Sequence, residues 1–178
     1  MKNIKLFTLV VLMLSLLGCN FRPLDFTGKD LSRQDLSGKN YNRAIFADSD
    51  LQYSILTGSK MNKANFSKAN MQYSSITSAM LNNATFTDAK LTGTNFTESS
   101  LKNVDFSNLN LQDVTFSNCD LSGSKFNNTN LSGVVFNGAK LNNANFESSN
   151  ATLDSLFQAR SLKSTILPYG NKYQKIKK

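Results

Sequence analysis

A five-residue period constrains this chain more than any other feature of its sequence. From Phe26 to Phe146 every fifth residue is large and apolar, through twenty-five positions without a break. The residue two places before each is mostly small, as at Ala64, Ala69 and Ser74. A period of five fits neither an α-helix nor a β-strand, so each unit must turn the chain. We predict that the large residue and the small residue before it both face the interior.

Residue identity repeats with a second period, of twenty. Phenylalanine occupies seven positions twenty apart, from Phe26 to Phe146. We therefore expect residues twenty apart to stack, so that one coil consists of four five-residue sides. The phenylalanines would form an aromatic ladder along one wall. On the outside, Asn42, Asn62 and Asn82 would form a second ladder, whose side-chain amides bond one coil to the next.

These repeat units resemble a known family. Ala64–Lys68 (ANFSK) and Ala144–Ser148 (ANFES) match the pattern A(D/N)LXX of pentapeptide repeat proteins, and the resemblance covers 24–150. It implies an all-β solenoid, the right-handed quadrilateral parallel β-helix, with about six coils. At about 4.8 Å between coils, the rod would be roughly 30 Å long.

The first coil departs from the pattern. Lys29, Gln34 and Lys39 occupy the positions of the small inward residue. Both ends of a solenoid need caps, because a terminal repeat lacks a neighbour on one side. We expect this end to pack less tightly than the interior, and an uncovered rod end would also allow a homodimer.

The five-residue pattern fails at Ala151, which indicates a C-terminal cap over 151–168. Apolar residues then recur at helix-like offsets, namely Leu153, Leu156 and Phe157. We predict a short helix that covers the last coil, with Ser149 or Asn150 as its N-cap. A partner-binding helix is the alternative. Leu162 and Leu167 would form a last five-spaced pair, shifted by one residue in phase.

The first residues have the pattern of an export signal. A basic start, Met1–Lys5, precedes an apolar stretch, Leu6–Leu17. This stretch is too short to cross a hydrocarbon core, which takes about 20 helical residues, so a removable signal peptide is favoured. Leu16-Leu17-Gly18-Cys19 also resembles the lipobox of bacterial lipoproteins. An ordinary signal peptide, or a buried helix with a chance cysteine, is the alternative.

The lipobox resemblance implies an address at the cell membrane. Residues 1–18 would be a lipoprotein signal peptide, removed before Cys19, whose thiol would carry the lipid and be labelled by palmitate. Residues 19–23 would form a short lipidated tether that keeps the rod near the bilayer. Asn20, in place of Asp, favours the outer membrane facing the periplasm in a Gram-negative cell.

The positive charge lies at the C-terminal end. The 20 Lys+Arg and 12 Asp+Glu give a formal net charge of +8, and no acidic residue follows residue 156. We predict a flexible basic tail over 169–178. Its contacts with anionic lipids or polymers would come from Lys172, Lys175, Lys177 and Lys178. A solubilising tail without a partner is the alternative, and export argues against a nucleic-acid partner.

The sequence lacks the groups that catalysis usually needs. It has no histidine, which is the commonest general base and metal ligand, and only two cysteines. Phosphate-binding glycine loops, metal-ligand clusters and nucleophile constellations are absent. Cys119 lies at an inward position, where we expect a packed, inert thiol. We predict no catalytic residues, no cofactor and no metal, so the protein is not expected to be an enzyme.

One outer feature favours contact with another molecule. Tyr53 and Tyr73 are twenty apart within the matching strings LQYS and MQYS, so they should stack outward on neighbouring coils. Ile55 lies round the next corner. Exposed aromatic residues are enriched in interfaces. The alternative is that these are scattered apolar side chains with no partner.

These observations favour a membrane-anchored envelope lipoprotein that acts as a non-catalytic structural or protein-interaction module. Its partner would be an unknown envelope protein or polymer. The family resemblance supplies an alternative, because some pentapeptide repeat proteins mimic duplex DNA and interact with DNA gyrase in the cytoplasm. That mimicry needs an acidic rod, whereas residues 19–156 hold 12 basic and 12 acidic residues. A third alternative, an enzyme that acts on peptidoglycan, is disfavoured because the sequence lacks the usual catalytic groups.

Overall fold

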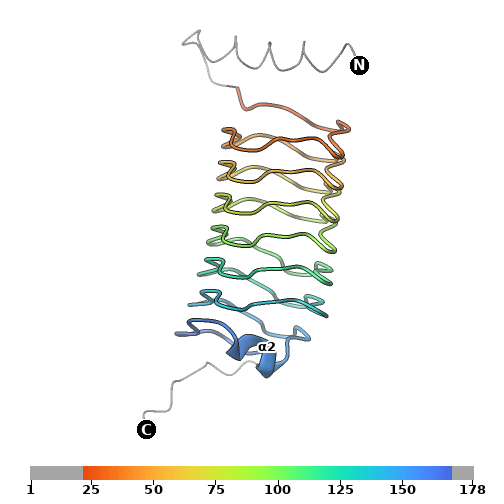
Figure 1. The fold of residues 1–178 in the computed structure, drawn as a ribbon. Helices are drawn as coiled ribbons and strands as arrows, with labels where there is room; N and C mark the ends of the chain where they lie inside the picture. The colour runs from red at the N-terminus through yellow and green to blue at the C-terminus, as the bar shows by residue number, and fades with distance from the viewer. Residues whose placement is uncertain (1–21, 170–178) are drawn as a thin grey trace.

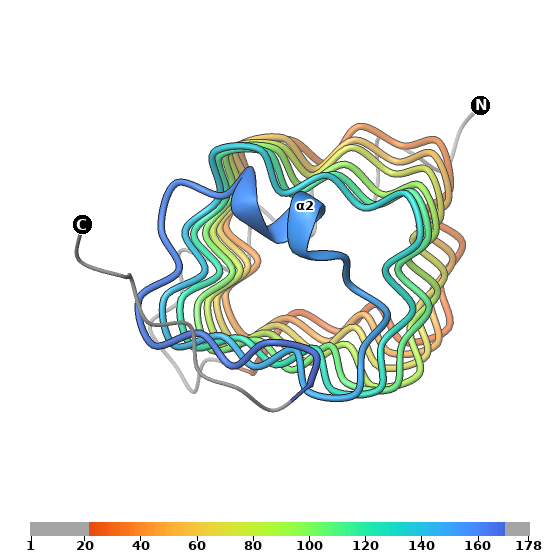
Figure 2. The same cartoon turned by 90° about the horizontal axis from the view of Figure 1, so that it is seen from below.

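Parallel β-bridges between residues twenty apart organise the chain, from Asp25 with Ile45 to Lys125 with Asn145. The computed structural model describes residues 22–169, and this offset divides 25–144 into six stacked coils (Figure 1). Viewed along its axis, the rod has four sides (Figure 2). Among the described residues, each strand is an isolated bridge and the one helix is α2, Leu153–Phe157. The predicted quadrilateral β-helix is confirmed.

Each side of a coil ends in a tight turn, which the repeat at residues 65–69 illustrates. The Ala69 N–H donates to the Phe66 carbonyl at 3.0 Å, and Lys68 between them has a φ of 58°. This is the pattern of a type II turn, whose third residue needs a positive φ. Asn65 Oδ1 accepts hydrogen bonds from the Ser67 N–H at 2.9 Å and the Ser67 hydroxyl at 2.6 Å. The Asp or Asn of the repeat motif therefore stabilises the turn.

Positive φ values recur at every fifth residue from Gly28 to Ser148. Glycine, asparagine and aspartate tolerate this conformation, but Tyr53 and Tyr73 also adopt it. The ladder between coils offsets the cost of these turns. The Lys68 N–H, for example, donates to the carbonyl of residue 87 in the next coil at 2.8 Å. The local conformation is thus held in place by the neighbouring coil.

The interior contains two aromatic ladders. The predicted one is confirmed: the seven phenylalanines from Phe26 to Phe146 stack with centroid separations of 4.6 to 5.4 Å. A second ladder, which was not predicted from the sequence, lies on the opposite wall, where Phe96, Phe116 and Phe136 stack at 5.4 and 5.7 Å. Rings of the two ladders meet edge to face across the interior.

The predicted outer asparagine ladder is also confirmed. The Oδ1 of Asn42 accepts from the Asn62 N–H at 2.9 Å, and the Oδ1 of Asn62 accepts from the Asn82 N–H at 3.1 Å. Asn82 in turn accepts from the Lys102 N–H at 2.9 Å. These side chains continue the backbone ladder along one corner of the rod.

The C-terminal cap contains α2, whose N-cap differs from the prediction. Thr152 is the N-cap, and its side chain accepts from the Ser155 N–H at 3.2 Å. The prediction of Ser149 or Asn150 as the N-cap was wrong, because both residues still belong to the β-helical repeats. Asn150 Oδ1 accepts from the Leu131 N–H at 2.6 Å, so its side chain is already used. Figure 2 shows α2 over part of the rod's C-terminal end.

Beyond α2 the chain returns to the ladder with a shift of one residue. Lys140 pairs with Ser161 and Asn145 with Ile166, at an offset of twenty-one instead of twenty. Leu162 is buried, and Leu167 packs against the core. The predicted phase shift is confirmed. Of the helix, Leu156 is buried, whereas Leu153 and Phe157 stay 42% and 54% exposed.

At the other end, the large residues of the first coil are slightly exposed. Phe26, Leu31, Leu36 and Tyr41 have exposed fractions of 4 to 9%, whereas their counterparts one coil further are fully buried. The three polar residues at inward positions are exposed, namely Lys29, Gln34 and Lys39. The first coil is therefore packed less completely than the interior, as expected.

The ladder is interrupted between the fourth and fifth coils. Elsewhere in the six coils the N–H of a large apolar residue donates to the carbonyl nineteen residues on, with few exceptions near the C-terminal end. Among the described residues, Phe86 and Leu91 make no such short bond; Thr85 still forms a parallel bridge with Asp105, whereas Lys90 forms none with Asn110. The bond that would run back from the Asn110 N–H to the Ala89 carbonyl is missing as well. The two coils are thus separated along one side.

Leu109 gives the physical reason for this separation. It lies at the inward position that Ala89 occupies one coil earlier and Thr129 one coil later. Leu109 is buried, so its larger side chain must fit between two coils built for small residues. The coils move apart locally and lose backbone hydrogen bonds.

Candidate interaction surface

The two outward tyrosines stack as predicted. The rings of Tyr53 and Tyr73 are 5.4 Å apart between centroids and 13° from parallel. Their exposed fractions are 49% and 53%. Each occupies the turn position with positive φ, which directs the side chain away from the interior of the coil. The type II turn therefore places two aromatic rings side by side on one face of the rod.

The stack extends further than the tyrosine pair. The guanidinium carbon of Arg33 lies 5.0 Å from the Tyr53 ring centroid, a cation–π contact. At the other end Tyr73 lies against Gly93, where an added Cβ would come within 2.5 Å of the Tyr73 ring. We call Arg33, Tyr53, Tyr73 and Gly93 the aromatic column. Sequence reasoning missed Arg33 and Gly93, although their spacing of twenty was a usable signal.

The geometry of the aromatic column limits what it can bind. Both faces of Tyr53 are covered, by Arg33 and by Tyr73, and Tyr73 lies between Tyr53 and Gly93. A ligand would therefore meet ring edges and hydroxyl groups. Ile55, 44% exposed, lies in a separate column between Asp35 and Ser75. The structure thus brings the two tyrosines together, whereas Ile55 does not belong to the aromatic column.

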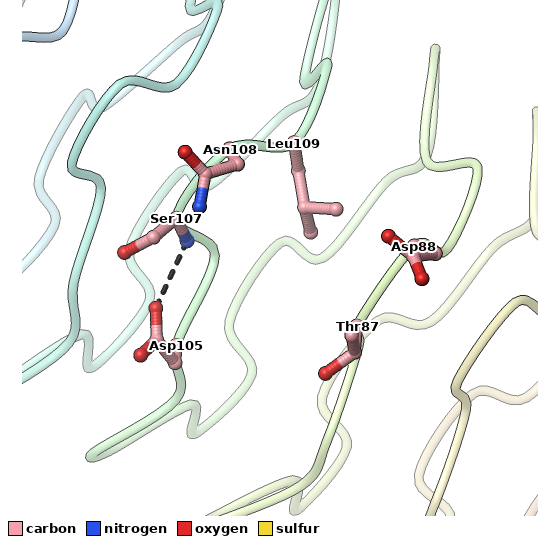
Figure 3. A pocket seen from close by; sticks show the side chains of 6 residues that line it. All are labelled: Thr87, Asp88, Asp105, Ser107, Asn108 and Leu109. Carbon is pink, nitrogen blue, oxygen red and sulfur yellow. Dashed lines mark hydrogen bonds between the residues drawn. The ribbon is translucent and has the colours of Figure 1, made fainter.

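A crevice of about 250 Å³ lies where the ladder is interrupted. Figure 3 shows Leu109 between the two coils, with the other lining residues, namely Thr87, Asp88, Asp105, Ser107 and Asn108, around it. Burial raises the pKa of Asp105, but hydrogen bonds from Ser107 and the nearby Lys125 outweigh it and leave the pKa below its usual value. Such a carboxyl stays ionised and is not tuned as a general acid.

Cys119 matches the expectation of an inert thiol. It is fully buried, and its Sγ donates to the Phe96 carbonyl at 2.8 Å. Burial raises the pKa of Cys119 to about 12, which keeps the thiol protonated at neutral pH. The part of the chain that the structure describes holds no group of three or more His, Cys, Asp or Glu side chains placed to bind a metal.

Charges on the rod pair between coils. The Oδ2 of Asp120 lies 3.3 Å from the Nζ of Lys102 and 3.7 Å from the Nζ of Lys140. The Oδ2 of Asp105 lies 3.5 Å from the Nζ of Lys125. Cys19 and the four predicted contact lysines, namely Lys172, Lys175, Lys177 and Lys178, lie outside the described residues. Within residues 22–169, no helix is long and apolar enough to cross a membrane.

These features define a β-helical rod with a filled interior and stacked side-chain columns on its faces. The pentapeptide repeat region model matches residues 96–167, and the pentapeptide repeats (8 copies) model matches 25–62 and 44–83. The chain belongs to the pentapeptide repeat family. Comparison with curated proteins gave no significant match.

Several solved structures resemble the chain at low identity. HetL from the cyanobacterium Nostoc sp. strain PCC 7120, a pentapeptide repeat protein involved in heterocyst differentiation regulation, is 16% identical. The match covers 92% of this chain and 98% of HetL, with a TM-score of 0.37. QnrB1, a plasmid-mediated fluoroquinolone resistance protein, is 15% identical over 72% of this chain and 75% of its own, with a TM-score of 0.40. Rfr23 from the cyanobacterium Cyanothece 51142 is 20% identical over 89% and 97%, with a TM-score of 0.30. The rods superpose only loosely, and nothing about the function of this chain follows from them.

Proposed function

We propose that this protein is a lipid-anchored envelope protein whose rod is a non-catalytic interaction module. The observation that carries the proposal is the exposed aromatic column on a rod whose interior is filled. Rings that are half exposed, yet fixed by stacking, lose little conformational entropy on binding, which favours their use in an interface. A non-catalytic role is supported by the lack of histidine and by the thiol of Cys119, which is buried and protonated.

The membrane part of the proposal rests on the sequence before the rod. Leu16-Leu17-Gly18-Cys19 would supply the lipid, and a partner in the envelope would then meet the sides of the rod. A role as a DNA mimic that binds gyrase is the competing function. It is disfavoured because the described residues hold 14 basic and 12 acidic residues, so the rod lacks the charge of a nucleic acid.

Site-specific photo-cross-linking tests the interaction role. A photoreactive residue replaces Tyr53 in one variant and Lys63 in the other. Both positions lie on the same coil with the same turn conformation, but on different sides. In intact cells, position 53 is expected to yield a discrete cross-linked envelope partner that position 63 does not. Equal products from both positions, or capture of gyrase subunits, would contradict the proposal.

A further inference from the structure

The N-terminal end of the rod carries an unusual arrangement of cations. Lys29 and Lys39 occupy inward positions. The equivalent residues one coil later, Ser49 and Ser59, are both buried. We infer that this end is a docking surface for anionic lipid headgroups, so that the rod stands with its first coil toward the bilayer. The inference rests on the proposed lipid anchor and adds an orientation to it.

The fold leaves these two lysines only one way to solvent. Side chains at this position start toward the interior, which the next coil fills with the buried residues Phe46, Leu51, Leu56 and Met61. Lys29 and Lys39 are nevertheless exposed. We infer that their ammonium groups reach solvent at this end of the rod, because no coil precedes the first one among the described residues. In every later coil this position holds a small or apolar residue.

Charge at this end is net positive: among the described residues its cations form no ion pair within 4.0 Å, although Lys29 interacts electrostatically with Asp25 and Lys39 with Asp35. Residues 22–44 hold five cations, Arg22, Lys29, Arg33, Lys39 and Arg43, against three aspartates. Each aspartate binds its own turn, as Asp25 Oδ1 does when it accepts from the Thr27 N–H at 2.9 Å. Among the described residues, ion pairs involve only Lys102, Lys125 and Lys140, far from this coil. Phosphate groups of a bilayer would complement the first coil.

The proposed anchor lies at this same end. Cys19 is three residues before Arg22, so the chain can separate them by at most about 11 Å. The first coil lies at the opposite end of the rod from α2 (Figure 1). A lipid on Cys19 would therefore hold the cationic end, and not the C-terminal cap, near the headgroups. Polar residues on a terminal repeat also prevent stacking with a second rod, which is the competing role.

Binding to vesicles tests the surface without the anchor. The mature chain, 19–178, with Cys19→Ala and with Lys172, Lys175, Lys177 and Lys178 changed to Gln is mixed with vesicles of phosphatidylcholine, with or without 30 mol% phosphatidylglycerol (roughly one anionic lipid in three). Lys29→Gln/Lys39→Gln is compared with Lys63→Gln/Lys68→Gln, which also removes two exposed lysines from the rod. We expect the first pair to weaken binding to anionic vesicles by roughly thirtyfold, about fivefold per lysine.

The control pair should change binding less than twofold, and phosphatidylcholine alone should bind none of the variants. Equal losses from both pairs would overturn the inference. Dimerisation of Lys29→Gln/Lys39→Gln in sedimentation, with vesicle binding intact, would also overturn it and assign these lysines to preventing end-to-end stacking. Because this assay uses no lipid on Cys19, its result does not depend on whether the anchor exists.

Orientation is then measured on the lipid-bearing protein. A fluorophore is attached at Asp30→Cys in one variant and at Asn130→Cys in another. The two sites lie in one column, five coils apart. Each native side chain accepts a hydrogen bond from the N–H of the serine two residues on, so the two sites are matched. Quenchers in the headgroup region should quench residue 30 strongly and residue 130 weakly. Equal quenching at both sites would show a rod lying flat and would contradict the inference.

Discussion

At the scale of single residues, each side chain in this rod depends on the residue twenty positions away. Tyr73 can stack on Tyr53 and still lie flat on the next coil because residue 93 is glycine. Gly93 has a φ of 68°, so it serves the turn and the contact together. Gly58 has a φ of 67° with nothing near the position of its absent Cβ, and serves the turn alone.

Gly93→Ala should therefore destabilise the protein more than Gly58→Ala. Both substitutions place a side chain at positive φ, at a cost of roughly 1 kcal/mol. Only Gly93→Ala also forces the Tyr73 ring to move, which should add about 1 kcal/mol and alter the near-ultraviolet circular dichroism of the tyrosines. Urea denaturation of the two variants measures the difference. Equal losses of stability with unchanged tyrosine signals would mean that the contact is absent.

At the scale of the repeat element, most of the fold could be predicted because each unit carries its own turn signal. Asn65 caps the turn that Lys68 makes, so the sequence of one unit determines its local shape. The N-cap of α2 could not be predicted, because Asn150 is a good N-cap residue whose side chain instead bonds to Leu131. That competition exists only once the coils are stacked.

The interrupted ladder was equally invisible in the sequence. Leu109 is an apolar residue at an inward position, and only packing against Ala89 and Thr129 decides whether the coils accommodate it. For the aromatic column the limit was different. Arg33 and Gly93 share the spacing of twenty with the tyrosines, so the same period that predicted the pair could have extended it.

Leu109→Ala should cost less stability than an ordinary truncation in this core. Removing a buried leucine usually costs about 2–5 kcal/mol, and Leu111→Ala, at a fully buried position in the same coil, should fall in that range. Leu109→Ala should let the coils close and restore hydrogen bonds, which offsets much of the loss. Hydrogen exchange should then slow at the Leu91 and Asn110 amides, where the bridge between Lys90 and Asn110 is missing. Similar costs for both variants, with unchanged exchange, would refute this explanation.

At the scale of the whole molecule, the rod is a stack in which each coil contacts only its neighbours, so its ends and faces differ in role. The interior is filled by two aromatic ladders. Part of the C-terminal end is covered by α2, whereas the first coil carries a net positive charge. The aromatic column lies on the first coils, near the proposed anchor, and would meet partners close to the membrane.

Palmitate labelling with membrane fractionation tests the proposed lipid anchor, by comparing the wild type with Cys19→Ala and Cys119→Ala. Cys119 is the matched control, because it is the second cysteine of the chain and is buried in the rod. We expect the wild type and Cys119→Ala to be labelled and membrane-bound, and Cys19→Ala to be unlabelled and released from the membrane. An unlabelled, full-length wild-type chain in the cytosol would contradict the account.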